Sequence, residues 1–359
     1  MGVRSVRFHD LFAVRHLEAH PDSYVIWPSP LEAQHSATYL ALASAWQDVN
    51  QTLFTFVLRE KRQMIGMAQA AAQSGHDAWE VLRLSLVPAD PEDRERAADA
   101  LFEQLLAAIG GRGGMRVFAG VTDGEEGQIL LHRQGFRRYT TQYSLLCEHL
   151  DIPPTPLPEH LGLRLRRPAD AWGIFQLYCS LAPPSVRHAE GLSSKRWNRG
   201  TSLFHSLTRH WLPGHEVVLT DEGLIVGWVR LTQIKGHAAQ RLEVMLHPRV
   251  NDTLPALLAH AMVALNARLD RHTVCYVREY EATVYSGLQE MGFTVVAEQA
   301  LLVKHMATRV TERQLLIAAL RAQGLGIDVS RYQQPGTGVS TLANLTTVEL
   351  PLHDRTRTN

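Results

Sequence analysis

Residues 83–88 read RLSLVP, and residues 243–248 read EVMLHP. In both stretches an apolar run ends at a proline, directly before a long segment whose apolar residues recur at helical spacing. Proline is excluded from central strands but fits the first turn of a helix. The two stretches therefore predict the same local structure twice, a buried strand that leads into a helix.

The two stretches belong to a longer internal repeat. When the chain is laid on itself with a shift of about 160 residues, further segments match in the same order. The matching pairs are 6–10 with 165–170, 65–67 with 226–228, 84–88 with 244–248 and 135–136 with 292–293. Solenoid repeats run about 20–50 residues, so this period indicates duplicated domains.

A proline-rich segment, DIPPTPLPE at 151–159, lies between the copies. Such a sequence is extended and semi-rigid, and it cannot continue a helix or a central strand. We therefore predict an N-terminal domain at 1–150, a linker at 151–161 and a C-terminal domain at 162–308. Residues 309–359 are predicted to form an amphipathic helix followed by a flexible tail rich in Gly, Thr and Pro.

Each copy shows the same order of predicted elements. A β-hairpin is followed by a strand, a long helix, a strand, a short helix and a final strand. In the second copy these are 215–220 and 224–233, then 241–247, 254–269, 273–278, 281–291 and 294–304. The order predicts an α/β fold in which helices cover a mixed sheet.

Composition narrows the function classes. The 359 residues are 45% hydrophobic and 20% charged, and Lys+Arg and Asp+Glu both number 36, so no general attraction to nucleic acid or anionic membrane is expected. Three cysteines without CxxC spacing indicate neither a disulfide framework nor a zinc site, and no metal is expected. The sequence has no apolar run of membrane-spanning length. We expect a cytoplasmic protein.

The repeated unit resembles the GNAT fold of acyl-coenzyme A-dependent N-acetyltransferases. The resemblance rests on the strand that ends in proline, on a later helix that runs into Gly-Phe, and on the strand after Gly-Phe. The helix reads LLHRQGF at 130–136 and GLQEMGF at 287–293. The similarity covers residues 1–148 and 162–306 and implies two GNAT-like domains in tandem.

In that family acetyl-coenzyme A lies in a V-shaped split between two central parallel strands, and backbone amides at the start of the long helix hold its pyrophosphate. In the second copy the resemblance implies a cofactor site formed by Met245, Leu246, His247, Asn251, Asp252, Thr253, Leu254 and Ala256. When this segment is compared with the family's glycine-rich turn, only Ala256 matches the residue type expected at its position. Asp252 places a carboxylate near the phosphates. The first copy has acids there too, which also stabilise a helix dipole.

The resemblance also implies an acid and a base for acyl transfer to an amine. Glu243 lies on the strand before the long helix, where the family often has a base; the alternative is an ion pair with Arg230 or Arg241. Leu288 occupies the usual tyrosine position, and Tyr285, one turn earlier, is the candidate acid or an ordinary packing residue. The first copy has Arg83 and Leu131 at the equivalent positions, so the second copy is the expected active one.

The sequence therefore predicts an acyl-coenzyme A-dependent N-acyltransferase whose acceptor is a small-molecule or peptide amine. The alternative is a tandem GNAT protein without catalytic activity that binds a small ligand or another protein. The acceptor, the oligomeric state and the role of the tail are left open. Both interpretations depend on one structural expectation. The two parallel strands of the second copy should enclose a slot that is open at the start of the helix.

Overall fold

The computed structural model describes residues 2–18, 23–25, 37–46, 52–61, 63–73, 77–88, 90–122, 126–150, 152, 155–192, 197, 215–233, 239–265 and 271–306. All of them belong to one compact unit, Met1–Thr308. The predicted helix and tail after residue 309 lie outside the described residues.

The first copy comprises the elements up to β7. Its strands are β1 (Gly2–Ser5), β2 (Ser23–Val25), β3 (Leu53–Glu60), β4 (Gln63–Ala72), β5 (Ala78–Leu86), β6 (Arg116–Thr122) and β7 (Arg137–Cys147). Its helices are η1 (Phe8–Asp10), α1 (Leu11–Glu18), α2 (Ala37–Trp46), α3 (Pro91–Gly111) and α4 (Glu126–Arg133).

The second copy repeats this order. Its strands are β8 (Leu161–Leu165), β9 (His215–Asp221), β10 (Leu224–Gln233), β11 (Ala239–Leu246), β12 (His272–Arg278) and β13 (Thr294–His305). Its helices are η3 (Pro168–Asp170), α5 (Ala171–Leu181), α6 (Pro184–Glu190), η4 (Pro248–Thr253), α9 (Leu254–Ala264) and α10 (Ala282–Glu290). The α/β fold with a mixed sheet is confirmed.

The repeat extends to individual hydrogen bonds. In the first copy the Arg4 guanidinium donates to both carboxylate oxygens of Asp10, at 2.7 and 2.8 Å. In the second copy Arg164 donates to Asp170 in the same way, at 2.6 and 2.7 Å. Each aspartate also accepts a backbone N–H from three residues earlier. This bidentate pair fixes the turn that joins the first strand of each copy to its first helix.

The repeated Gly-Phe ends the short helix of each copy in the same geometry. Gly135 and Gly292 have φ of +83° and +89°, in the left-handed region that glycine adopts without steric cost. Phe136 and Phe293 then return to the helix, where their backbone N–H groups donate to Leu131 and Leu288. Both phenylalanines are fully buried, so the helix end is fixed by its cap and by the core.

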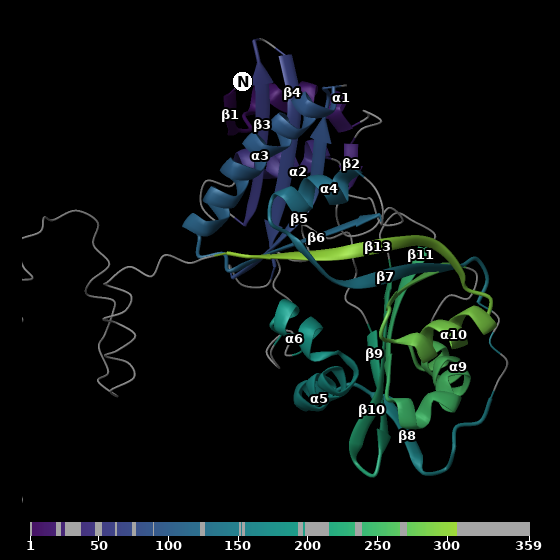
Figure 1. Cartoon of the computed structure of the whole chain (residues 1–359). Helices are drawn as coiled ribbons and strands as arrows, with labels where there is room; N and C mark the ends of the chain where they lie inside the picture. The colour runs from purple at the N-terminus through teal and green to yellow at the C-terminus, as the bar shows by residue number, and fades with distance from the viewer. Residues whose placement is uncertain are drawn as a thin grey trace, which may run out of the picture. The chain divides into compact units, whose positions relative to one another are not determined.

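Helices cover both faces of the sheet in each copy (Figure 1). In the first copy α3 and α4 pack over one core, which includes Leu101, Phe102 and Leu131, while α1 and α2 cover the other face. In the second copy α9 and α10 cover one face and α5 and α6 cover the opposite one. The α5/α6 face carries Met245, and this is the face toward which Glu243 also points by strand alternation.

The last strands of the two copies are exchanged. All strands except β2 follow the order β1-β3-β4-β5-β6-β13-β7-β12-β11-β10-β9-β8 in one sheet. Strand β13 of the second copy pairs with β6 of the first, and β7 of the first copy pairs with β12 of the second. Figure 1 shows β7 and β13 running side by side between the two sets of helices. Each copy therefore completes the sheet of the other.

Candidate functional site

The parallel strands of the second copy separate part-way along their length. Strand β11 pairs with β12 only from Ala239 to Leu242, which face His272 to Cys275. Strand β11 continues to Leu246 while pairing with β10 on its other edge. Among the described residues no strand pairs with residues 243–246 on the edge that faced β12. This split lies where the sequence predicts the cofactor slot.

The long helix α9 begins without a side-chain cap, whereas the η4 turn before it is capped by His247, whose Nδ1 accepts the Arg249 N–H. Residues 248–253 form the η4 turn, which ends in a kink before α9 starts at Leu254. The Thr253 hydroxyl donates to the Val250 carbonyl at 2.6 Å instead of accepting a backbone N–H, and α9 has no capping hydrogen bond from its N-cap side chain. Unpaired amides at such a start attract anions.

The other predicted cofactor residues divide into two groups. The side chains of Met245, Leu246, Leu254 and Ala256 are buried in the cores, so any contact they make with a cofactor in this geometry comes from their backbone. Asp252 is exposed, whereas the side-chain oxygen of Asn251 is buried and has no hydrogen-bond partner. Burial and Arg249 lower the pKa of His247, whose Nδ1 accepts the Arg249 N–H at 3.3 Å.

Glu243 is held by both arginines that the sequence offers as its partners. Its carboxylate lies 2.9 Å from Arg241 and 3.5 Å from Arg230. Arg230 in turn lies 3.8 Å from Glu216, which also accepts the indole N–H of Trp228 at 2.9 Å. Glu243 is therefore part of an ion-pair network on the α5/α6 face.

Tyr285 lies elsewhere. It packs on the core beneath α9 and α10, with its ring 4.9 Å from that of Tyr143. Glu243 points to the opposite face, so the structure does not bring the two predicted catalytic residues together across one surface. Their assignment stays a prediction.

The corresponding split in the first copy is occupied by the chain itself. Strand β5 pairs with β6 only from Ala78 to Glu80, while β4 uses the other edge of β5. Beyond the split, Arg83 to Ser85 pair with strand β2, at Val25 to Ser23. Strand β2 therefore lies on the edge of β5 where the second copy has no strand in the described part of the chain.

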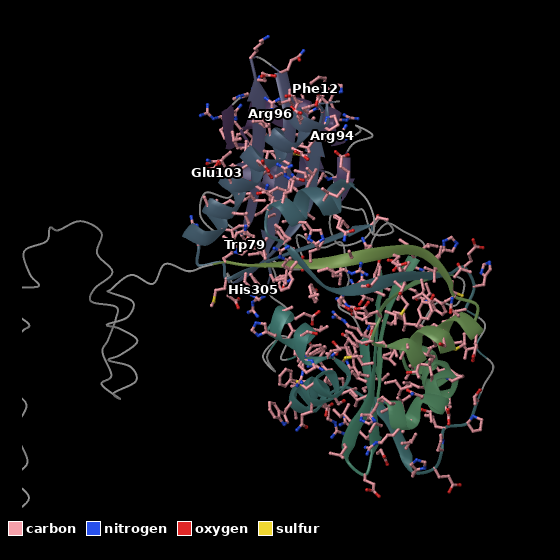
Figure 2. The ribbon with its side chains drawn as sticks, in the orientation of Figure 1. Phe12, Trp79, Arg94, Arg96, Glu103 and His305 are labelled. Carbon is pink, nitrogen blue, oxygen red and sulfur yellow. The ribbon has the colours of Figure 1, made fainter. Side chains whose placement is uncertain are left out.

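Side chains also fill the helix start of the first copy. The Asp90 carboxylate caps α3 by accepting the Glu92 backbone N–H at 2.8 Å. Arg94, labelled near the start of α3 in Figure 2, donates to the Pro88 carbonyl and lies 2.6 Å from Glu126 of α4. This ion pair links the end of β5 to the helix that follows β6, so it bridges the mouth of the split.

The structure places a group of polar residues that the sequence did not single out at the end of β12. We call it the β12-end cluster: Tyr139, Tyr178, Glu190, Arg278, Tyr280 and Glu281. Tyr178 donates to Glu190 at 2.7 Å, and Arg278 lies 3.7 Å from the same carboxylate. Glu281 accepts the Arg278 backbone N–H at 2.9 Å. In the sequence, Glu281 looked like an ordinary helix start, and the only signal was the charged stretch REYE directly after a strand.

Burial changes the acid strength of this cluster. It raises the pKa of Glu281 to about 7, against a backbone hydrogen bond and the positive charge of Arg278, which both lower it. Burial, together with Glu190, also raises the pKa of the Tyr178 phenol.

Within the described ranges, no three His, Cys, Asp or Glu side chains form a group suited to a metal ion, and no helix is long and apolar enough to cross a membrane.

No protein-family model matches the chain, and no curated protein matches it by sequence. Solved structures do match its fold. A tandem GNAT protein from the clavulanic acid biosynthesis pathway shares 12% identity, with 85% of this chain and 98% of that one covered and a TM-score of 0.53. A GCN5-related N-acetyltransferase from Sphaerobacter thermophilus shares 16% identity over 85% and 95% of the two chains, also with a TM-score of 0.53. The chain therefore has the tandem GNAT fold.

Proposed function

We propose that the protein is an acyl-coenzyme A-dependent N-acyltransferase with one working site, in the second copy. One observation carries this proposal: the split between β11 and β12 has no strand on its open edge among the described residues, whereas β2 occupies the equivalent edge of β5. The tandem GNAT fold supports the reaction class, because a similar fold belongs to a GCN5-related N-acetyltransferase.

In this proposal the donor, acetyl-coenzyme A, lies along residues 243–246, on the edge of β11 that pairs with no strand in the described part of the chain. Its pyrophosphate lies at the start of α9, which has no capping hydrogen bond from its N-cap side chain. The acceptor is a small-molecule or peptide amine that approaches from the α5/α6 face. Glu243 and Tyr285 stay our sequence-based candidates for proton transfer.

Calorimetric titration of the full chain with acetyl-coenzyme A tests the number of sites. We expect one molecule bound per chain, because the first copy's split and helix start are filled by its own residues. Two bound molecules would contradict the assignment of a filled first copy, and no binding would contradict the enzyme proposal.

A matched pair of substitutions tests where the molecule binds. Asp252→Asn removes an exposed carboxylate beside the proposed pyrophosphate site, so binding should tighten about fivefold, equivalent to about 1 kcal/mol of like-charge repulsion. Asp93→Asn makes the same change at the start of α3 and should leave the affinity unaltered. The reverse pattern would place the site in the first copy.

A binding module without catalysis is the second candidate. It is favoured by the ion pairs of Glu243 with Arg241 and Arg230, which hold this carboxylate in a role that needs no chemistry. Thiol release from acetyl-coenzyme A in the presence of amines separates the two functions. Binding without release of thiol, across amines of different size and charge, would favour the module.

A further inference from the structure

Four carboxylates line the α5/α6 face of the second copy, and one of them differs from the rest. Glu216, Glu243 and Glu190 each lie against an arginine side chain, at 3.3, 2.9 and 3.7 Å. Glu281 is half-buried, and the interaction it makes among the described residues is with the Arg278 backbone N–H. Its second carboxylate oxygen has no hydrogen-bond partner there. Of these four carboxylates, Glu281 is thus the one that forms no ion pair with a described arginine.

The position of Glu281 relates it to the split. It is the N-cap residue of α10 and lies three residues after the end of β12, the strand across the split from Glu243. Cys275, the last residue of β12 that pairs with β11, is influenced by both carboxylates: burial and Glu281 raise the pKa of its thiol, Arg241 lowers it and Glu243 raises it. Glu281 and Glu243 therefore lie on the two sides of the point where the strands part.

The surroundings of Glu281 come from several elements. Arg278 and Tyr280 precede it in the chain, Glu190 lies on α6, Tyr178 on α5 and Tyr139 on β7. On β11, Arg241 and Glu243 are the charged groups that act on the pKa of the Cys275 thiol. Tyrosine rings and carboxylates together attract a cationic amine, by cation–π and charge interactions. Tyr139 belongs to the first copy, so both copies contribute to this surface.

We propose that Glu281, rather than Glu243, accepts the proton from the acceptor's ammonium group, in a subsite formed by the β12-end cluster. The inference rests on the proposed acyltransferase function. The ammonium R–NH₃⁺ gives one proton to the Glu281 carboxylate and becomes R–NH₂. The nitrogen lone pair bonds to the thioester carbonyl carbon, and the carbon–sulfur bond breaks with its electrons going to sulfur. The nitrogen loses a second proton to the leaving thiolate, which yields the amide and free coenzyme A.

The acid strength of Glu281 suits this role. A general base works best when its pKa lies near the working pH, and burial raises the pKa of this carboxyl to about 7. An ammonium ion bound beside the carboxylate would lower that pKa, because an opposite charge within about 4–6 Å favours the ionised form. The response of Glu281 to a simple amine can therefore be measured without knowing the natural acceptor.

The experiment follows glutamate carboxyl resonances by NMR in the full chain, labelled with ¹³C at the glutamate carboxyl carbons and supplied with acetyl-coenzyme A. We expect one resonance that titrates near pH 7, is absent from Glu281→Gln and is retained in Glu243→Gln. Ethylammonium chloride, compared with sodium chloride at the same ionic strength, should lower its midpoint by about 1–3 pH units. Glu281→Asp keeps an acid at the site but removes the labelled glutamate carboxyl, so the resonance should be absent from this variant as well.

Two results would overturn the inference: loss of the resonance in Glu243→Gln instead of Glu281→Gln, or a midpoint that ethylammonium leaves unchanged. Thermal melting of each variant shows whether the fold is intact, and Glu281→Asp replaces Glu281→Gln if the latter unfolds. Calorimetry with acetyl-coenzyme A is run on the same samples. Donor binding with an unresponsive Glu281 refutes this inference alone, whereas the absence of donor binding refutes the proposed function.

Discussion

At the scale of single residues, Asp170 shows how a repeated ion pair links stability to pH. The hydrogen bonds from Arg164 lower the pKa of Asp170, and burial raises it. The hydrogen bond from the Arg167 backbone N–H lowers this pKa further. A folded-state pKa below the unfolded value near 3.9 means that the contribution to stability is present above that value. It is lost as the pH falls through the folded pKa.

We predict that Asp170→Asn lowers the free energy of unfolding by about 1.5–3 kcal/mol at pH 7, the usual value of hydrogen bonds to a charged group. The difference from the wild type should shrink as the pH falls below about 4, where the aspartate itself becomes protonated. Urea denaturation at several pH values measures both effects.

Glu60→Gln is the matched control, because Glu60 is exposed at the end of β3 and its loss should change stability by less than about 0.5 kcal/mol. A pH-independent difference for Asp170→Asn would show that the carboxylate does not contribute through its charge.

Single residues also show where sequence reasoning reaches its limit. The alternation of β11 was enough to predict that Glu243 shares a face with Met245 and that Arg230 or Arg241 could pair with it. The pKa of Glu281 depends on burial and on Glu190, which lies on α6 and is distant in sequence. No local pattern around residue 281 carries that information.

At the scale of elements, the two copies differ most in what lies beside the splayed strand. In the first copy β2 satisfies the backbone of β5 beyond the split. In the second copy no described strand pairs with the same edge of β11, so this edge can bind another partner. Backbone groups without a partner are costly when they are removed from water, so this edge is suited to a ligand that can donate and accept hydrogen bonds.

Hydrogen–deuterium exchange tests this difference between the copies. Backbone amides in residues 243–247 should exchange more slowly when acetyl-coenzyme A is added, because the bound donor shields that edge. Those in residues 83–87 should be unaffected, since β2 already covers the matching edge. Equal slowing in both segments would mean that the donor displaces β2 from the first copy.

Strand patterns predicted some elements well and others not at all. The bounds of β10 agree with the expected 224–233, because β-branched and aromatic residues end at clear turn signals. Strand β2 is only Ser23–Val25, too short to show an alternating pattern, and its place depends on the edge of β5. The sequence predicted the start of the long helix at residue 254, where α9 begins, but it did not predict the short η4 helix before it.

At the scale of the whole described unit, the exchange of β7 and β13 decides which residues form each core. Ala300 and Leu302 of β13 belong to the core of the first copy, and Leu145 and Cys147 of β7 belong to that of the second. The sequence predicted both strands, but their partners, 126 or more residues away in the sequence, follow from the three-dimensional arrangement. The domain bounds at 1–150 and 162–308 stay a prediction for the chain, although the sheet continues across them.

We predict that residues 1–150 and 151–308, expressed separately, do not reach the stability of the full chain. Each would lack a strand of its sheet, and the loss of large apolar contacts in a core costs about 2–5 kcal/mol per side chain. Co-expressed fragments should purify together and regain a cooperative urea transition. Circular dichroism and denaturation of each fragment alone provide the measurement.

The control is a full chain that carries a protease site within the linker at 151–161. After cleavage the two pieces should stay associated, because the exchanged strands, rather than the covalent link, hold them together. A lone first fragment that unfolds cooperatively at the same urea concentration as the full chain would contradict the importance of the exchange.

The exchange of β7 and β13 also limits how such a gene can change. A truncation that discards the N-terminal half, with its filled split, would also discard the strand that borders β12 and with it Tyr139. The half whose split is filled by β2 therefore cannot be lost without harm to the half in which no described strand fills the split. A duplicated copy can in this way become indispensable because its strands pair with those of the other copy, rather than through any chemistry of its own.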